Sequence, residues 1–299
     1  MTTITDTKII SLNSEDGIAL NNSYLSRIRF DLPNLIKDDK TVIHRQISVL
    51  NAQIPFSFYN VNSYYNTFTL KFGGSPVPIT IPEGNYNSTN LFSTLSTYIK
   101  NLTTYTFTFS ISNITGIVTI QSVTNFSVSS SGTMNKLLGL SQTADTTSTL
   151  ISGNYTAVGI YPLNLLGTKK LQLRSGILSM GNYSSNNGGL NTLLLTIPVN
   201  ASPFGMIDYT SISNSLISFS NTNLDEIDIS ITDAEDNNPI DFHNQNWTLT
   251  LAIYEYKKLI DAPVADLETS TTQLLKQTEI PKPEKPKKAI DPILEFLQK

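Results

Sequence analysis

The chain has 299 residues, no cysteine and a formal net charge of −4, with charged residues making up only 15%. Without cysteine, neither a disulfide framework nor a thiolate metal site can form. The acidic balance argues against a general nucleic-acid binder, because a surface that follows phosphates needs clustered Lys and Arg. No apolar run approaches the ~20 residues of a membrane span, and the first residues lack a signal peptide's apolar core. We therefore expect no membrane span. The length of the chain predicts one or two domains.

The first part of the chain predicts three strands, over residues 9–12, 24–32 and 41–54. Turn formers separate the first two strands, and Pro33 is expected to end the second because proline lacks a backbone donor. In the third strand the apolar residues do not alternate regularly with polar ones, so they would not all lie on one face of a regular strand. A β-bulge near Gln46 or Ser48 would place them on one face.

Residues 63–140 predict a different, ββαβββ pattern. A hairpin turns at Gly73 and Gly74, and a helix follows in which the apolar residues fall on one stripe behind Asn87, a candidate cap. Three alternating segments come next, and one helical turn over residues 134–140 is expected to close at Gly139. This pattern indicates a small α+β module inserted into all-β surroundings.

The second half returns to strands after a connector over residues 145–159, which we interpret as polar and irregular. Strands are predicted at residues 171–173, 193–199 and 212–219, with residues 200–208 as a turn region. The clearest alternation follows in the segments 224–232 and 247–253, which we predict to form an antiparallel pair with one buried face. Trp247 begins the inward series, so we expect a buried indole with a satisfied N–H.

Three strands before the insertion and five after it predict a mainly β fold. The fold class is a single eight-stranded jelly roll, an antiparallel β-sandwich of two four-stranded sheets, with an inserted small α+β (ββαβββ) domain. The predicted divisions are residues 1–62 and 146–262 for the jelly roll, 63–145 for the insert and 263–299 for a flexible tail. An insertion between the third and fourth strands leaves the topology intact, because end loops of a sandwich tolerate extra length.

The tail combines a basic, proline-rich spacer over residues 281–288 with a short apolar patch. The patch consists of Ile293, Leu294, Phe296 and Leu297. We predict that this patch binds a partner protein. The lysines of the spacer are interpreted as solvated, with a contact to RNA or DNA as the less favoured reading.

The sequence offers little catalytic chemistry. A serine or cysteine hydrolase needs a base, yet the two histidines, His44 and His243, accompany no Gly-x-Ser-x-Gly elbow. The acidic residues between 225 and 241 could bind Ca²⁺, but they lack an EF-hand's spacing, so a solvated face is favoured. We expect no enzyme activity, no catalytic residues, no cofactor and no metal. A carbohydrate-active enzyme on a β-sandwich is the alternative from a different class.

Six segments together resemble penton-type capsid proteins. They are residues 47–60 (ISVLNAQIPFSFYN), 81–86 (IPEGNY), 137–140 (LLGL), 161–167 (YPLNLLG), 197–201 (IPVNA) and 247–251 (WTLTL). Their order along the chain is similar to that in the penton or minor capsid proteins of virophages and large eukaryotic DNA viruses. The resemblance covers residues 9–256 and leaves the tail uncovered.

The resemblance implies a structural role in an icosahedral virion. The family's members form the pentameric vertex, so it implies a homopentamer that contacts double jelly-roll major capsid proteins. It also implies synthesis in the host cytoplasm and a final location in the capsid. The alternative is a host-attachment or glycan-binding minor capsid protein that acts through the inserted domain.

Overall fold

The computed structural model describes residues 2–20, 25–178, 182–183, 190–212, 215–219 and 223–258. The tail and its predicted apolar patch, Ile293, Leu294, Phe296 and Leu297, therefore lie outside the described residues. Residues Thr2–Lys257 form one compact unit by backbone proximity. Within this unit the buried hydrophobic side chains gather in two separate clusters.

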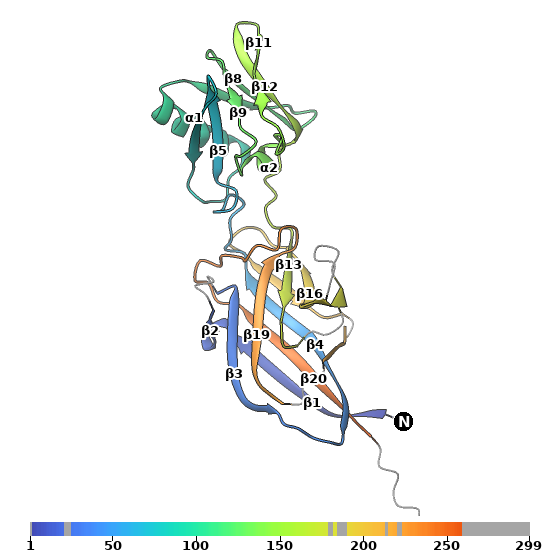
Figure 1. Ribbon diagram of the computed structural model, residues 1–299. Helices are drawn as coiled ribbons and strands as arrows, with labels where there is room; N and C mark the ends of the chain where they lie inside the picture. Colours follow the sequence, from blue (N-terminus) through green and yellow to red (C-terminus); the bar gives the residue numbers. More distant parts are fainter. Residues whose placement is uncertain are drawn as a thin grey trace, which may run out of the picture. The chain divides into compact units, whose positions relative to one another are not determined.

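The first cluster lies between two antiparallel sheets (Figure 1). One sheet has the order β1-β20-β4-β17, with β18 also paired to β4, and the other has the order β16-β13-β19-β3-β2. The strands of the first are β1 (Thr2–Asn13), β20 (Thr248–Lys258), β4 (Val42–Pro55), β17 (Met206–Thr210) and β18 (Ile217–Phe219). Those of the second are β16 (Leu193–Pro198), β13 (Lys170–Arg174), β19 (Leu224–Asp233), β3 (Arg27–Ile36) and β2 (Ile18–Ala19).

This strand order is that of a jelly roll. Without the short β2 and β18, the strands in chain order form the sheets 1-8-3-6 and 5-4-7-2. Consecutive strands therefore lie in different sheets, except strands 4 and 5, which pair within one sheet, as in a double Greek key. The mainly β, antiparallel sandwich predicted from the sequence is confirmed. Each sheet has five described strands where four were predicted, because β2 extends one edge and the last edge strand of the other sheet is split into β17 and β18.

Alternation along the sequence explains the packing of this core. Ile227, Ile229 and Ile231 of β19 are buried, and so are Trp247 and the alternate leucines of β20. The indole N–H of Trp247 donates to the Leu25 carbonyl oxygen at 2.9 Å. Both predictions for this pair of strands, the inward face and the satisfied indole, are confirmed.

The chain between β4 and β13, residues 56–169, is called the inserted segment below. It builds two four-stranded antiparallel sheets, β10-β9-β5-β6 and β11-β12-β8-β7, around the second cluster. Their strands are β5 (Thr67–Phe72), β6 (Ser75–Thr80), β7 (Phe107–Ile111), β8 (Ile117–Ser122), β9 (Ser127–Val128), β10 (Thr146–Thr147), β11 (Thr149–Ile151) and β12 (Asn154–Pro162). A further two-stranded sheet elsewhere in the chain joins β14 (Asn182–Tyr183) to β15 (Leu190–Asn191).

Two helices complete the inserted segment, α1 (Ser88–Thr103) and α2 (Asn135–Leu138). The side chain of Asn87 caps α1 by accepting from the Asn90 N–H at 2.9 Å. Gly139 ends α2 in the left-handed conformation, with a φ of 69°. A Cβ there would lie 2.0 Å from the Tyr161 carbonyl oxygen, so only glycine fits. The helix, its cap and the Gly139 stop agree with the sequence predictions.

Four local predictions are wrong. Pro33 does not end its strand: β3 continues to Ile36 through an irregularity in which Asn34 takes a φ of 60°. The bulge in β4 falls at Leu50, where the register with β20 shifts between Asn51 and Val49. The predicted turn region, residues 200–208, overlaps a strand, because β17 spans Met206–Thr210. Residues 146–162, assigned to the jelly roll or to a connector, pair with β8 and β9 of the inserted segment.

Strands β10, β11 and β12 were missed because hydroxyl and small side chains are frequent in their sequences. In β12 only Tyr155 and Ala157 face the second cluster, while Thr156 and Val158 occupy the alternate positions. So weak an alternation is hard to tell from a polar loop. The division of the chain into separate domains stays a prediction. Strands β10, β11 and β12 pair within the sheets of the inserted segment, so the end predicted for the insert, residue 145, lies too early in the chain.

Candidate functional site

A free sheet edge is the strongest candidate site in the described part of the chain. Strands β17 and β18 pair with β4 on one side, and the sheet order ends with them on the other. Along this edge the chain exposes large apolar side chains. They are Phe204, Met206, Ile212 and Leu216. We call these four residues the edge patch; an exposed apolar row on an unpaired edge is typical of a protein interface.

Phe204 stands out within the edge patch. Its side chain is 78% exposed, although its backbone has a φ of 67°. For a bulky residue this left-handed conformation is unfavourable by roughly 1–2 kcal/mol. Two hydrogen bonds hold the turn: the Phe204 N–H donates to the Phe56 carbonyl oxygen at 2.8 Å, and the Gly205 N–H to that of Ser202 at 2.9 Å. The fold thus holds a strained backbone to present an aromatic ring to solvent, which points to a role outside the monomer.

The acidic residues between 225 and 241 have protein partners of their own. Asp225 accepts from the Asn34 N–H at 2.8 Å, and Asp233 accepts from the N–H groups of Glu235 and Asp236 in its own turn. Glu235 pairs with Lys169 at 3.3 Å, and Asp236 with Lys136 at 2.7 Å. Over the described residues no group of three or more His, Asp or Glu side chains could hold a metal ion.

The two histidines lie in unrelated surroundings. His44 is exposed on β4; its Nε2 lies 3.3 Å from the Ser218 hydroxyl, and its ring lies 5.5 Å from that of Tyr256. In the described structure no carboxylate hydrogen bond to this imidazole is seen, so the arrangement lacks the group that would orient a base. His243 packs on the Tyr59 ring with 4.2 Å between centroids. These contacts favour a packing role for both.

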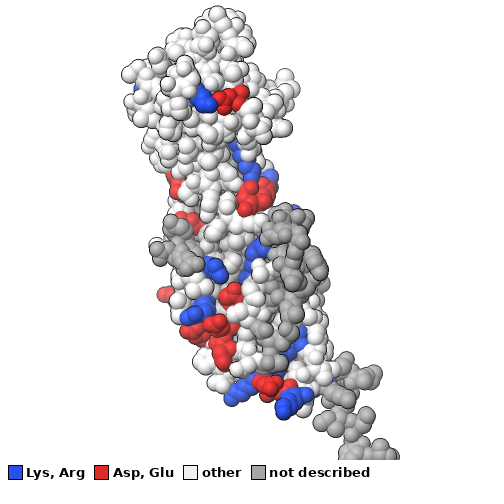
Figure 2. Space-filling model, viewed as in Figure 1, with Lys and Arg blue, Asp and Glu red and all other residues white. Residues whose placement is uncertain are grey.

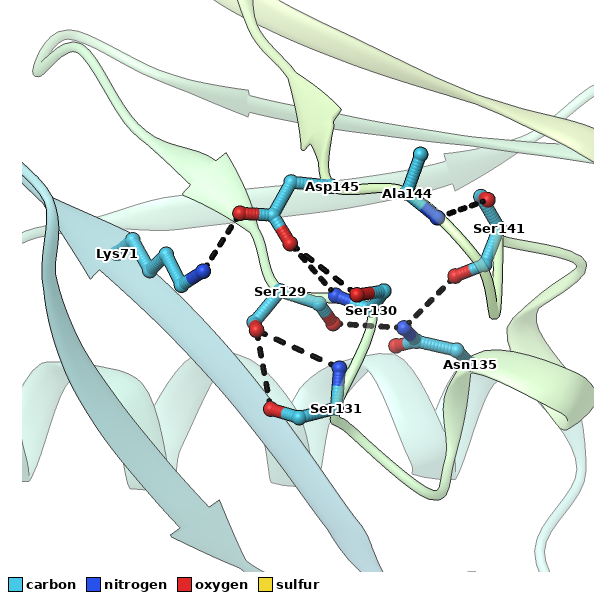
Figure 3. Close-up of polar contacts among 8 residues, drawn as sticks. All are labelled: Lys71, Ser129, Ser130, Ser131, Asn135, Ser141, Ala144 and Asp145. Atoms are coloured by element: carbon cyan, nitrogen blue, oxygen red, sulfur yellow. Dashed lines mark hydrogen bonds and ion pairs between the residues drawn. The ribbon is translucent and has the colours of Figure 1, made fainter.

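A polar cluster in the inserted segment joins β5 to the loops around α2 (Figure 3). The Asp145 carboxylate accepts from Lys71 Nζ at 2.6 Å and from the Ser130 N–H at 3.0 Å. Buried Asn135 donates from Nδ2 to the carbonyl oxygens of Ser129 and Ser141, at 2.7 and 3.0 Å. The cluster ties together loops that have little apolar surface, so we assign it a structural role.

Asp145 gives this cluster a predicted pH dependence. The Lys71 ammonium and then the Ser130 N–H hold the pKa of Asp145 below its ordinary value of 3.8. A lowered folded-state pKa stabilises the fold above pH 3.8, and that contribution is lost as the pH falls through the folded-state value. Asp145→Asn should therefore lower Tm at pH 6, and its difference from the wild type should shrink below pH 3.8. Thermal melts from pH 6 to 2 measure this, with exposed Glu83→Gln as the control. A difference that persists at pH 2 would contradict the assignment.

Charge is distributed unevenly over the chain. On the face that Figure 2 shows, the inserted segment has few charged side chains. By sequence, six of the 44 charged residues (20 plus 24) fall in residues 56–169: Lys71, Glu83, Lys100, Lys136, Asp145 and Lys169. The inserted segment is rich in Ser and Thr. It also exposes large apolar side chains, among them Leu150, Val158, Ile160 and Tyr161.

No protein-family model matches the chain, and no curated protein matches it. Among solved structures, the crystal structure of the selenomethionine-labelled mavirus penton protein is similar to it, with a TM-score of 0.43 and 10% sequence identity. The likeness covers 84% of this chain and 100% of that one.

None of the helices in the described ranges is long and apolar enough to cross a membrane. Sequence reasoning missed the edge patch because residues 200–208 were interpreted as a turn. The signal was present in the alternation of Ile207 and Tyr209, which pack on the first cluster, with Met206, Asp208 and Thr210. The predicted site in the tail lies outside the described residues, so the edge patch is a second candidate site in addition to it.

Proposed function

We propose that this protein is a structural capsid protein that forms the pentameric vertex of an icosahedral virus particle. The edge patch carries the proposal, because strain at Phe204 is retained to expose an apolar ring at a sheet edge. The jelly roll is compatible with it, since viral capsids use this fold, although lectins and cupins do too. The order of the six segments that resemble pentons favours the capsid among these.

A closed ring of five copies needs two different surfaces on each subunit, because its interfaces are heterologous. The edge patch supplies an apolar surface for one side. In the same sheet the other edge strand is β1, where the exposed side chain of Ile9 offers an apolar contact for the second surface. We propose that the edge patch of one copy packs against the β1 side of the next.

The substitution Phe204→Gly should impair assembly without impairing folding. Glycine adopts a φ of 67° without the penalty that a bulky residue has, so the free energy of unfolding should stay level or rise by up to about 1 kcal/mol. Removal of the ring should nevertheless shift pentamers toward monomers. Analytical ultracentrifugation and negative-stain images of the full chain measure assembly, and chemical denaturation measures stability.

Ser152→Gly is the matched control, because Ser152 is also exposed with a positive φ of 51°, in the β11–β12 turn. It should gain similar stability and leave assembly unchanged. If the wild type stays monomeric alone, the same variants are compared by vertex occupancy after co-expression with the double jelly-roll major capsid protein. Equal assembly of Phe204→Gly and the wild type would refute the proposed contact.

The tail patch remains a proposal of the same kind. Ile293, Leu294, Phe296 and Leu297 would bind a neighbouring capsid subunit, and five weak contacts displayed on one vertex would act together. In the co-expression experiment, truncation after Asp261 should lower vertex occupancy. The truncated chain alone should form pentamers to the same extent as the full chain. Contact between the tail lysines and the genome stays the less favoured alternative.

The charge-poor surface of the inserted segment favours one second function, attachment to a neutral glycan. Hydroxyl groups beside exposed Val158 and Tyr161 suit a ligand without charge. Binding of the full chain to a glycan array, retained in Phe204→Gly, would support this function separately from assembly.

A further inference from the structure

The outer face of the second jelly-roll sheet carries a cavity of about 590 Å³. The polar residues that matter here come from β3, β13 and β19 and from the turn after β13. They are Arg27, Arg174, Ser175, Asp228, Ser230 and Thr232. Cavities of this size are typical of small-molecule sites.

Strand register places two arginines on either side of one serine. Ser230 of β19 is directly opposite Arg27 of β3 and directly opposite Arg174 of β13. Neighbouring strands lie about 4.8 Å apart, so the two arginine Cα atoms flank Ser230 across roughly 10 Å. The two arginines therefore line one cavity over the row of outward-facing side chains that includes Ser230 and Thr232.

The guanidinium of Arg174 is held in a fixed orientation. It donates to the Thr232 hydroxyl at 3.3 Å, to the Asn237 side-chain oxygen at 2.6 Å and to the Gln172 side-chain oxygen. The side chain is buried, and burial lowers the pKa of Arg174 from its ordinary value. A guanidinium already positioned loses little conformational entropy on binding a planar anion.

The acidic residue of the cavity is directed elsewhere. Asp228 accepts from the Ser175 hydroxyl at 2.8 Å, from the Gly176 N–H at 3.0 Å and from the Ile177 N–H at 3.1 Å. Its carboxylate thus fixes the turn after β13. Among the lining residues that the structure describes, two side chains are cationic and one is anionic, so their net charge of +1 favours an anion.

We propose that this cavity binds an acidic sugar. The carboxylate or sulfate would bind between Arg27 and Arg174, over Ser230 and Thr232, through charge-assisted hydrogen bonds. The hydroxyl of Thr232 lies in reach of the sugar's hydroxyl groups, and Leu20 and Pro239 give the cavity an apolar wall for the ring. The inference does not depend on the proposed vertex function.

Isothermal titration of the full chain with sodium glucuronate and with glucose 6-sulfate tests the proposal. Both should bind, and neutral glucose at the same concentration should not. Inorganic sulfate should bind at least tenfold more weakly than the sulfated sugar. Binding of glucose as strong as that of glucuronate, or of sulfate as strong as that of its sugar ester, would overturn the assignment, as would no binding of either acidic sugar.

Two arginine variants locate the site. Arg27→Gln, at an exposed position, should weaken glucuronate binding about tenfold or more, the effect of losing one charge-assisted hydrogen bond. Arg29→Gln is the matched control: it lies two residues along the same strand, opposite Asp228, and does not line the cavity. Circular dichroism confirms that both variants fold. Wild-type affinity in Arg27→Gln, or an equal loss in Arg29→Gln, would place the ligand elsewhere.

Discussion

Trp247→Ala should lower the free energy of unfolding by about 3–5 kcal/mol, which is the usual cost of removing a large buried aromatic side chain. The indole is 1% exposed and meets the Phe30 ring edge-on with 6.1 Å between centroids. It also satisfies the carbonyl oxygen of Leu25, a residue whose φ is 64°. The substitution therefore leaves both a cavity and an unpaired acceptor at the junction of β3 and β20.

Urea denaturation measures this loss in the free energy of unfolding, provided that the m value is the same in the variant and the wild type. Trp247→Phe keeps much of the ring volume and removes the donor, so it should cost about 1–3 kcal/mol. Ile9→Ala, at an exposed position in the neighbouring strand β1, should change stability by less than about 0.5 kcal/mol. A change below 1 kcal/mol in Trp247→Ala would mean that β20 faces the other way.

The second large effect is expected at a buried ion pair in the same sheet. Arg45 Nε donates to Glu255 Oε1 at 2.8 Å, and both side chains are less than 8% exposed. Arg45 also donates to the Lys37 carbonyl oxygen at 3.3 Å. Arg45→Met removes the guanidinium and leaves a carboxylate in a site that disfavours charge, so it should cost about 3–5 kcal/mol.

The double variant Arg45→Met with Glu255→Leu makes the prediction specific. It exchanges the pair for apolar side chains of similar volume and should recover most of the loss, because neither charge then stays buried. Arg29→Met breaks an exposed pair with Glu226 at 3.6 Å and should cost less than about 1 kcal/mol. Additive losses in the double variant would show that the two residues act independently.

The sequence predicted the elements with strong periodicity and missed those without it. Strands β19 and β20 were recognisable because isoleucine and leucine alternate with polar residues over a full strand, and α1 because a cap precedes one apolar stripe. Strand β17 was missed because Asn200, Ser202 and Pro203 suggested that the turn continued. In β12 a strand built from Tyr, Thr, Ala and Gly has too little contrast between its faces.

The candidate sites depend on pairing that a sequence does not display. Arg45 and Glu255 are separated by 210 positions and meet only because β4 and β20 are neighbours. The two arginines beside Ser230 come from strands on either side of β19, and their shared row follows from the register. Phe204 was visible as a residue, but its positive φ is a property of the folded turn.

The direction of β1 against β20 has a mechanical consequence. The Ser14 N–H donates to the Trp247 carbonyl oxygen, and the Trp247 N–H to the Ser14 hydroxyl, so the end of β1 lies beside the start of β20. The start of β1 therefore lies beside the end of β20, as Figure 1 also shows. A force that pulls the start of β1 away from the end of β20 would break the hydrogen bonds between the two strands one after another. The strands would therefore separate under a smaller force than one that shears them along their length.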